Sequence, residues 1–99
     1  PMTTENAVTV SGTLHLIKSD PSSPGKQKKY LHFSVRQDTQ KTDGSVRKDF
    51  LLARVYDPKL QESFKELEDG AKVLVRGDVR SSLGSGEMYI NVQEIEKLA

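Results

Sequence analysis

The sequence predicts an all-β fold, a small antiparallel barrel of five strands with one helix between the third and fourth strands. Three observations lead to this prediction. Five segments alternate apolar and polar residues with the period of two that is typical of a half-buried strand. One helix signal follows the third segment. The 99 residues, 34% of them hydrophobic, provide material for one modest core and one domain.

The predicted strands span residues 7–17, 30–37, 46–56, 71–80 and 87–97. Alternate positions in each segment are apolar, so we expect them to point into the barrel. These inward positions are Val8, Val10, Leu14, Leu16, Leu31, Phe33, Val35, Leu51, Ala53, Val55, Val73, Val75, Val79, Met88, Ile90 and Val92. Gly12 interrupts the first strand and indicates a bulge or a tight bend, as at a barrel corner.

The helix is expected to begin at Asp57 and Pro58, which supply an N-cap and a first-turn proline. Gly70 is expected to end it. Its apolar stripe would plug one open end of the barrel with Leu60, Phe64 and Leu67. The connections 18–29, 38–45 and 81–86 have loop composition, and Asp43-Gly44 predicts a hairpin turn.

This order of elements is the arrangement of the OB-fold barrel. An SH3-like barrel usually lacks such a helix, and a ferredoxin-like fold needs a second one. We expect the OB-fold domain to occupy residues 7–98, after a disordered N-terminus at 1–6. An N-terminal proline amine acts as a base in some tautomerases, but we interpret Pro1 as a cloning residue in front of Met2.

Composition excludes several classes of protein. The absence of cysteine excludes disulfides, thiolate zinc sites and cysteine nucleophiles. The 15 Lys and Arg residues nearly cancel the 14 Asp and Glu residues, which argues against a polycation that coats nucleic acid. No apolar run approaches the ~20 residues of a membrane helix, and no signal peptide is evident. We therefore expect a cytoplasmic protein that does not enter the membrane.

No motif predicts an enzyme, a metal site or a cofactor. His15 and His32 are the only histidines, and neither has the spacing of a metal or catalytic pair. No phosphate-binding glycine loop is present, and Gly84-Ser85-Gly86 is typical of a turn.

Positive charge gathers in residues 18–56, which hold nine Lys and Arg residues against four Asp and Glu residues. This stretch is either a footprint for phosphates or an ordinary solvated face of lysines. In the first interpretation, the cations that follow the phosphates are Lys28, Lys29, Arg36, Lys41, Arg47, Lys48, Arg54, Arg76 and Arg80.

Aromatic side chains are expected on the outer surface of the barrel. Phe50 and Tyr56 alternate with the inward residues of the third strand, and Arg54 lies between them. Tyr30, His32 and Arg36 project from the neighbouring strand to the same side. The ring of Phe50 is therefore either a platform on which a nucleobase stacks or a residue buried in an oligomer interface.

The chain resembles the bacterial-type single-stranded-DNA-binding protein (SSB) family over residues 7–98. The resemblance lies in an ordered set of segments at 8–14, 31–35, 49–56, 66–80 and 89–95. It includes an Asp-Pro pair at 20–21 and the pattern Gly-x-x-Val-x-Val-x-Gly at 70–77.

This resemblance implies that Phe50 and Tyr56 are base-stacking aromatics and that Arg80 is a basic contact at the end of the fourth strand. Lys41 and Gly84 stand near two positions where the family has aromatics, which implies weaker binding or more reliance on charge. The sequence ends at Ala99 without the family's linker and acidic tail. It is expected to be either a truncated chain or a minimal form.

The predicted function is non-catalytic, weakly sequence-specific binding of single-stranded DNA in replication, recombination or repair. The alternative is a primosome-like OB adaptor or protein-interaction module whose same surface contacts a protein. The resemblance also implies replication or recombination partners and a homodimer or homotetramer. Its subunit contact would involve Thr9, Ser11, Thr13 and His15 of the first strand.

Overall fold

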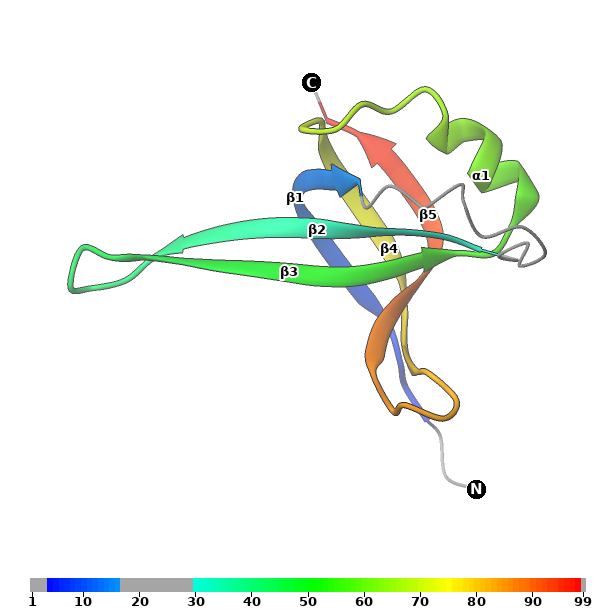
Figure 1. Ribbon diagram of the computed structural model, residues 1–99, viewed down its shortest axis with the longest axis horizontal. Helices are drawn as coiled ribbons and strands as arrows, with labels where there is room; N and C mark the ends of the chain where they lie inside the picture. Colours follow the sequence, from blue (N-terminus) through cyan, green and yellow to red (C-terminus); the bar gives the residue numbers. More distant parts are fainter. Residues whose placement is uncertain (1–3, 17–29, 99) are drawn as a thin grey trace.

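Five strands close into a barrel in the computed structural model, which describes residues 4–16 and 30–98. The strands are β1 (Val8–Leu16), β2 (Leu31–Gln40), β3 (Val46–Val55), β4 (Lys72–Ser81) and β5 (Met88–Lys97). Helix α1 (Pro58–Phe64) lies between β3 and β4 in the sequence (Figure 1). This is the predicted OB-fold. Predictions for residues 1–3 and for the connection 18–29, with Lys28 and Lys29, lie outside the described residues.

The strands follow each other around the barrel in the order β1-β2-β3-β5-β4. Four neighbouring pairs are antiparallel, whereas β3 and β5 run parallel at Ala53↔Ile90 and Arg54↔Asn91. A closed ring with an odd number of strands cannot alternate direction all the way round, so one pair must be parallel. This pair spans only two residues of each strand, so the barrel wall is least strongly paired between β3 and β5.

The core confirms the alternation read from the sequence. Its buried side chains come from all five strands and from α1, whose Phe64 packs its ring 4.8 Å from that of Phe33, between centroids. They are Leu14, Phe33, Val35, Ala53, Val55, Phe64, Val73, Val75, Ile90 and Val92. Val8, Val10, Leu31 and Leu51 are partly buried against this cluster.

Two residues expected in the core are exposed. Val79 is 38% and Met88 64% exposed. Val79 lies past Gly77, where the pairing of β4 with β1 ends, and Met88 is the first residue of β5, next to the hairpin loop that projects from the barrel (Figure 1). Together with Val8, Val10 and Leu51, they line an apolar groove at this end of the molecule. Apolar and polar residues continue to alternate along a strand after it has passed the core, so the pattern alone overestimates the number of core residues.

Helix α1 begins as predicted and ends early. The Asp57 Oδ1 atom accepts a hydrogen bond from the Lys59 amide at 2.9 Å, and Pro58 is the first helical residue. After Phe64 the amides of residues 65–67 donate to carbonyls three residues back, which is the tighter 3₁₀ pattern. The prediction that Gly70 ends the helix is therefore wrong. Gly70 has a φ of +90° in the turn before β4, where its amide donates to the Leu14 carbonyl.

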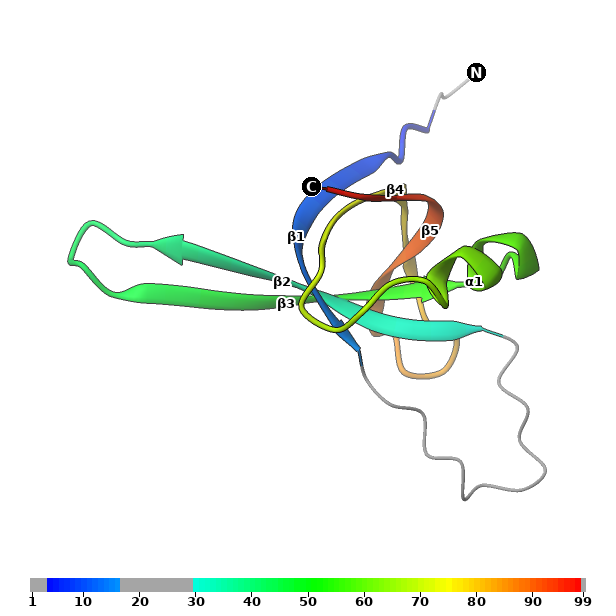
Figure 2. The same ribbon diagram turned by 90° about the horizontal axis from the view of Figure 1, so that it is seen from above.

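Strands β2 and β3 form a long two-stranded arm. They pair from Leu31↔Val55 to Gln40↔Val46, but β1 reaches only residues 33–36 of β2. The remainder projects from the barrel in both views (Figures 1 and 2). The turn predicted at Asp43 is confirmed, since its carboxylate accepts hydrogen bonds from both the amide and the hydroxyl of Ser45. Residues 38–40, expected in the loop, extend β2 instead.

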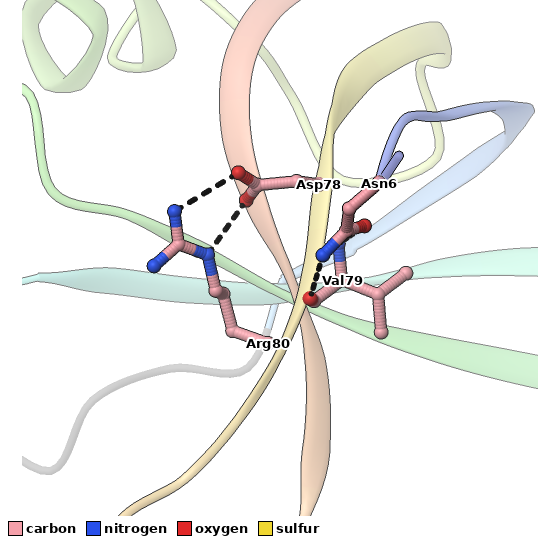
Figure 3. Close-up of polar contacts among 4 residues, drawn as sticks. All are labelled: Asn6, Asp78, Val79 and Arg80. Atoms are coloured by element: carbon pink, nitrogen blue, oxygen red, sulfur yellow. Dashed lines mark hydrogen bonds and ion pairs between the residues drawn. The ribbon is translucent and has the colours of Figure 1, made fainter. Parts of the chain in front are cut away.

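Asn6 is fixed against β4 just before β1 begins. Its side-chain amide donates to the Val79 carbonyl at 2.7 Å, and its Oδ1 atom accepts from the Val79 amide at 2.8 Å (Figure 3).

No helix within residues 4–16 and 30–98 is long and apolar enough to cross a membrane.

A bulge in β5 brings two backbones into close contact. Arg76 pairs with Glu94 and Gly77 with Val92, so Gln93 is an extra residue on β5. The bulge changes which side of β5 faces the core. It also presses Gly77 against the backbone of Asn91, where an added Cβ would overlap the Asn91 carbonyl oxygen.

We predict that Gly77→Ala destabilises the domain by about 1–3 kcal/mol, because the methyl group overpacks a buried backbone contact. Urea unfolding followed by circular dichroism measures this loss. Ser81→Ala, at the exposed end of the same strand, should change the free energy of unfolding by less than about 0.5 kcal/mol. Equal stability of the two variants would contradict the predicted contact.

Candidate nucleic-acid interface

Phe50 lies on the outer face of β3, opposite the inward Leu51, Ala53 and Val55. Its side chain is 51% exposed. An exposed phenylalanine contributes little to the barrel's core, so its ring is available to a ligand or partner. Tyr56, just after β3, is 40% exposed.

Arg54 is the centre of a cluster of aromatic residues. Its guanidinium carbon lies 4.5 Å from the ring centroid of Tyr30 and 4.1 Å from that of Tyr89. The same group donates hydrogen bonds to the Tyr56 hydroxyl and the Ser82 hydroxyl, each at 3.3 Å. We call these five residues the Arg54 cluster. Each cation–π contact of this kind contributes about 0.5–1 kcal/mol at an exposed site.

The barrel topology brings the Arg54 cluster together. Tyr30 precedes β2, whose first residue pairs with the last residue of β3, so it lies beside Tyr56 with ring centroids 5.1 Å apart. Tyr89 reaches Arg54 because β5 runs beside β3. Our sequence interpretation included Tyr30, Arg54 and Tyr56 but not Tyr89. The sequence did contain a signal for Tyr89, because it lies between positions 88 and 90, which were predicted to point inward, and so is expected to face outward.

Hydrogen bonding and charge shift the pKa values in this cluster. Burial raises the pKa of Tyr56, but hydrogen bonds with Arg54 and Tyr89 outweigh burial and hold this pKa below its ordinary value. The hydrogen bond with Tyr56 is the largest cause of the raised pKa of Tyr89, which Arg54 partly offsets.

His15 lies beside Phe50 on the outer surface, with ring centroids 5.6 Å apart in an edge-on arrangement. We expected it at a subunit contact with Thr9, Ser11 and Thr13. Its position places it on the same face as the candidate base-stacking ring. Thr9 and Ser11 are exposed further along β1, where the backbone pairs with β4. Their role at a subunit contact remains a prediction.

Most of the predicted phosphate-binding arginines are paired with carboxylates. The nitrogen–oxygen distances are 2.8 Å for Arg36–Asp38, 3.2 Å for Arg47–Asp49, 3.5 Å for Arg76–Glu94 and 3.0 Å for Arg80–Asp78. Figure 3 shows the last pair on β4. Three of the pairs join residues two apart on one strand, which places both side chains on one face. This spacing was visible in the sequence, but net charge alone did not reveal it.

These pairs stabilise the ionised carboxylates. The hydrogen bond from Arg36 holds the pKa of Asp38 below its usual value, and Arg80 does the same for the pKa of Asp78. Lys41 at the arm's tip has no salt bridge within the described part of the chain. Lys48 shares a face of the arm with Phe50, whereas Arg47 points to the opposite face.

Residues 8–98 match the family model described as an OB-fold nucleic acid binding domain. The chain belongs to this family. No curated protein matches the sequence.

Within the described residues, no group of three or more His, Cys, Asp or Glu side chains is arranged to hold a metal ion.

Several solved structures share this OB-fold. The N-terminal domain of PriB from Thermoanaerobacter tencongensis, described as dimeric, has a TM-score of 0.61 and 20% identity over 95% of this chain and 97% of that one. An SSB from Plasmodium falciparum in complex with single-stranded DNA has a TM-score of 0.71 and 16% identity, covering 100% and 99%. A small single-stranded DNA binding protein from Mycoplasma pneumoniae has a TM-score of 0.67 and 14% identity, covering 94% and 93%. The likeness to SSB proteins read from the sequence is confirmed in the fold.

We predict that Arg54→Met raises the pKa values of Tyr56 and Tyr89, because in the unaltered protein the Arg54 guanidinium lowers both pKa values. A spectrophotometric titration of tyrosinate should shift to higher pH. Arg36→Met is the matched control, since that guanidinium is paired with Asp38. An unchanged tyrosine titration in Arg54→Met, with the fold intact by circular dichroism, would contradict the cluster geometry.

Proposed function

We propose that this OB-fold domain binds single-stranded DNA without catalysing a reaction on it. The observation that carries the proposal is the half-exposed ring of Phe50 on the outside of the barrel, beside the Arg54 cluster. Unpaired bases stack on such rings, whereas the bases of a duplex are already stacked on one another. The Plasmodium structure of this fold, described as a complex with single-stranded DNA, supports the proposal.

In this proposal the DNA backbone follows the positive groups on the same face. Lys48 and Arg36 flank Phe50 on the arm, and Arg80 lies opposite Tyr89 on the β4–β5 hairpin. Arg36 and Arg80 are paired with carboxylates, so a phosphate must compete with Asp38 and Asp78 for them. We therefore propose that stacking contributes more to affinity than charge does. Processes that expose single strands, such as replication, recombination and repair, are where such a domain would act.

The apolar groove at the end of the barrel favours a second candidate function, as an adaptor that contacts another protein. Val79 and Met88 are exposed there, and the related PriB structure is described as dimeric. Titrations with single-stranded and duplex DNA, together with the solution mass of the protein, separate the two functions. Binding to neither DNA, accompanied by a stable oligomer, would favour the adaptor.

We predict that Phe50→Ala weakens binding to a fluorescein-labelled oligothymidylate roughly 5- to 150-fold, which corresponds to one lost base–ring stack of about 1–3 kcal/mol. Fluorescence anisotropy at low salt measures the dissociation constant. Met88→Ala, which removes a similarly exposed apolar side chain, is the control and should bind normally. Normal binding by Phe50→Ala would remove the central support for the proposal.

We also predict that Asp38→Asn strengthens binding and steepens its salt dependence, because it frees Arg36 for a phosphate. The slope of log affinity against log salt should increase by about 0.7 for each phosphate gained. Asp43→Asn removes an equal charge from the tip of the same arm without freeing a salt-bridged cation. If the two variants have the same slope, Arg36 does not contact the DNA backbone.

A further inference from the structure

A small pocket of about 80 Å³ opens beside the Arg54 cluster, where β2, β3 and β5 meet. Its apolar walls include Tyr30, Leu52 and Tyr89, and its polar groups include Arg54 and Glu87. This volume exceeds the roughly 10–15 Å³ that one ordered water molecule needs. The pocket therefore has room for the polar edge of one planar ring, while the rest of the ring stays outside.

The strand register shows that Glu87 faces this pocket. Ser82 and Glu87 close the β4–β5 hairpin, since the Ser82 amide donates to the Glu87 carbonyl and the adjacent residues Ser81 and Met88 are paired. Directly opposed residues project to the same face, as do residues two apart on one strand. The Ser82 hydroxyl and the Tyr89 ring both contact Arg54, so the side chain of Glu87 lies on the face of Arg54 as well.

The pocket thus combines a fixed donor with an acceptor. The Arg54 guanidinium has five N–H groups, and within residues 4–16 and 30–98 two of its nitrogens donate, to Tyr56 and Ser82. Glu87 forms no salt bridge with any residue in the described ranges, so its carboxylate remains free to accept. A free carboxylate repels phosphates, so in a surface that bound only the DNA backbone it would weaken affinity.

We propose that this pocket binds the Watson–Crick edge of one unpaired guanine. This proposal rests on the proposed function, because it requires that single strands cross this face. Guanine presents two adjacent donors, N1–H and the N2 amino group, which match the two oxygens of the Glu87 carboxylate. Its O6 atom is an acceptor that matches Arg54. Tyr30 and Tyr89, whose rings contact the Arg54 guanidinium, contribute aromatic walls of the pocket.

The other bases match the pocket less well. Thymine presents one donor between two acceptors, so one of its carbonyl oxygens would face the carboxylate. Adenine and cytosine each present one amino group followed by an acceptor. Each therefore offers a single donor to Glu87, and neither pairs with the carboxylate through two hydrogen bonds. The pocket adds one position of base preference to a surface whose stacking contacts accept every base.

Competition between labelled oligonucleotides tests the proposal. One probe is a ten-nucleotide oligothymidylate, and the second carries a single central dG, which cannot form a quadruplex. A third carries deoxyinosine at that position, which keeps N1–H and O6 but lacks the N2 amino group. We expect the dG probe to bind about tenfold more tightly than oligothymidylate, with the deoxyinosine probe between them.

Glu87→Gln tests the assigned acceptor. The variant should bind oligothymidylate at least as well as the unaltered protein, because a negative charge is lost, and it should lose the preference for dG. Glu96→Gln, an equal loss of charge near the other end of β5, should retain the preference. A melting curve for each variant verifies folding.

The outcomes separate this inference from the proposed function. Equal affinity for the dG and thymidine probes, or a preference for another base, would overturn the guanine pocket and leave single-strand binding intact. A dG preference that survives Glu87→Gln would overturn the role of Glu87. Failure to bind any probe at low salt would instead overturn the proposed function, and the inference with it.

Discussion

The outer surface of this barrel depends on the guanidinium of Arg54. The ring of strands closes where β3 meets β5, and that parallel contact spans only two register pairs. Arg54 lies in one of them and contacts Tyr30 on one side and Tyr89 and Ser82 on the other. One side chain therefore supports the weakest part of the barrel wall and also orients the tyrosines that face solvent. If the domain binds DNA as we propose, stability and ligand recognition depend on the same contacts.

The charged groups show a second constraint, which follows from strand geometry. Residues two apart share a face, so an arginine and an aspartate at that spacing are neighbours before any ligand arrives. Arg36, Arg47 and Arg80 are all held in this way. Exposed ion pairs of this kind contribute little to stability. Their main effect is to reduce the positive field around these arginines, which in the proposed function leaves ring stacking as the stronger attraction for a nucleic acid.

The sequence predicted the parts of the fold that repeat. Phe33, Val35 and Val55 were assigned to the core correctly, because a period of two is a local property that the barrel preserves. Val79 and Met88 were assigned wrongly, because the same period continues in a hairpin that has left the core. The helix ended before Gly70, because closing the barrel favoured a tight turn that bonds Gly70 to Leu14 of β1, a contact distant in sequence.

The candidate site was less accessible to sequence reasoning for a related reason. Phe50 stood out because it is an aromatic on an outward position, which a pattern reveals. The proximity of Tyr89 and Glu87 to Arg54 depends on which strands are neighbours in the closed barrel, and no local pattern contains that information. Knowledge of the strand order would have placed Tyr89 beside Arg54 directly.

The contact between Asn6 and Val79 has a consequence for how the domain behaves at high concentration. Val8 of β1 pairs with Gly77 of the antiparallel β4, so Asn6, two residues before Val8, lies opposite Val79, two residues after Gly77. Its side-chain amide, one donor and one acceptor, imitates a peptide group and occupies both backbone sites of Val79. An uncovered stretch of strand edge is a template for adding strands from other molecules. A single asparagine thus leaves the Val79 backbone with no free hydrogen-bonding group toward Asn6 at which the strand of another molecule could add.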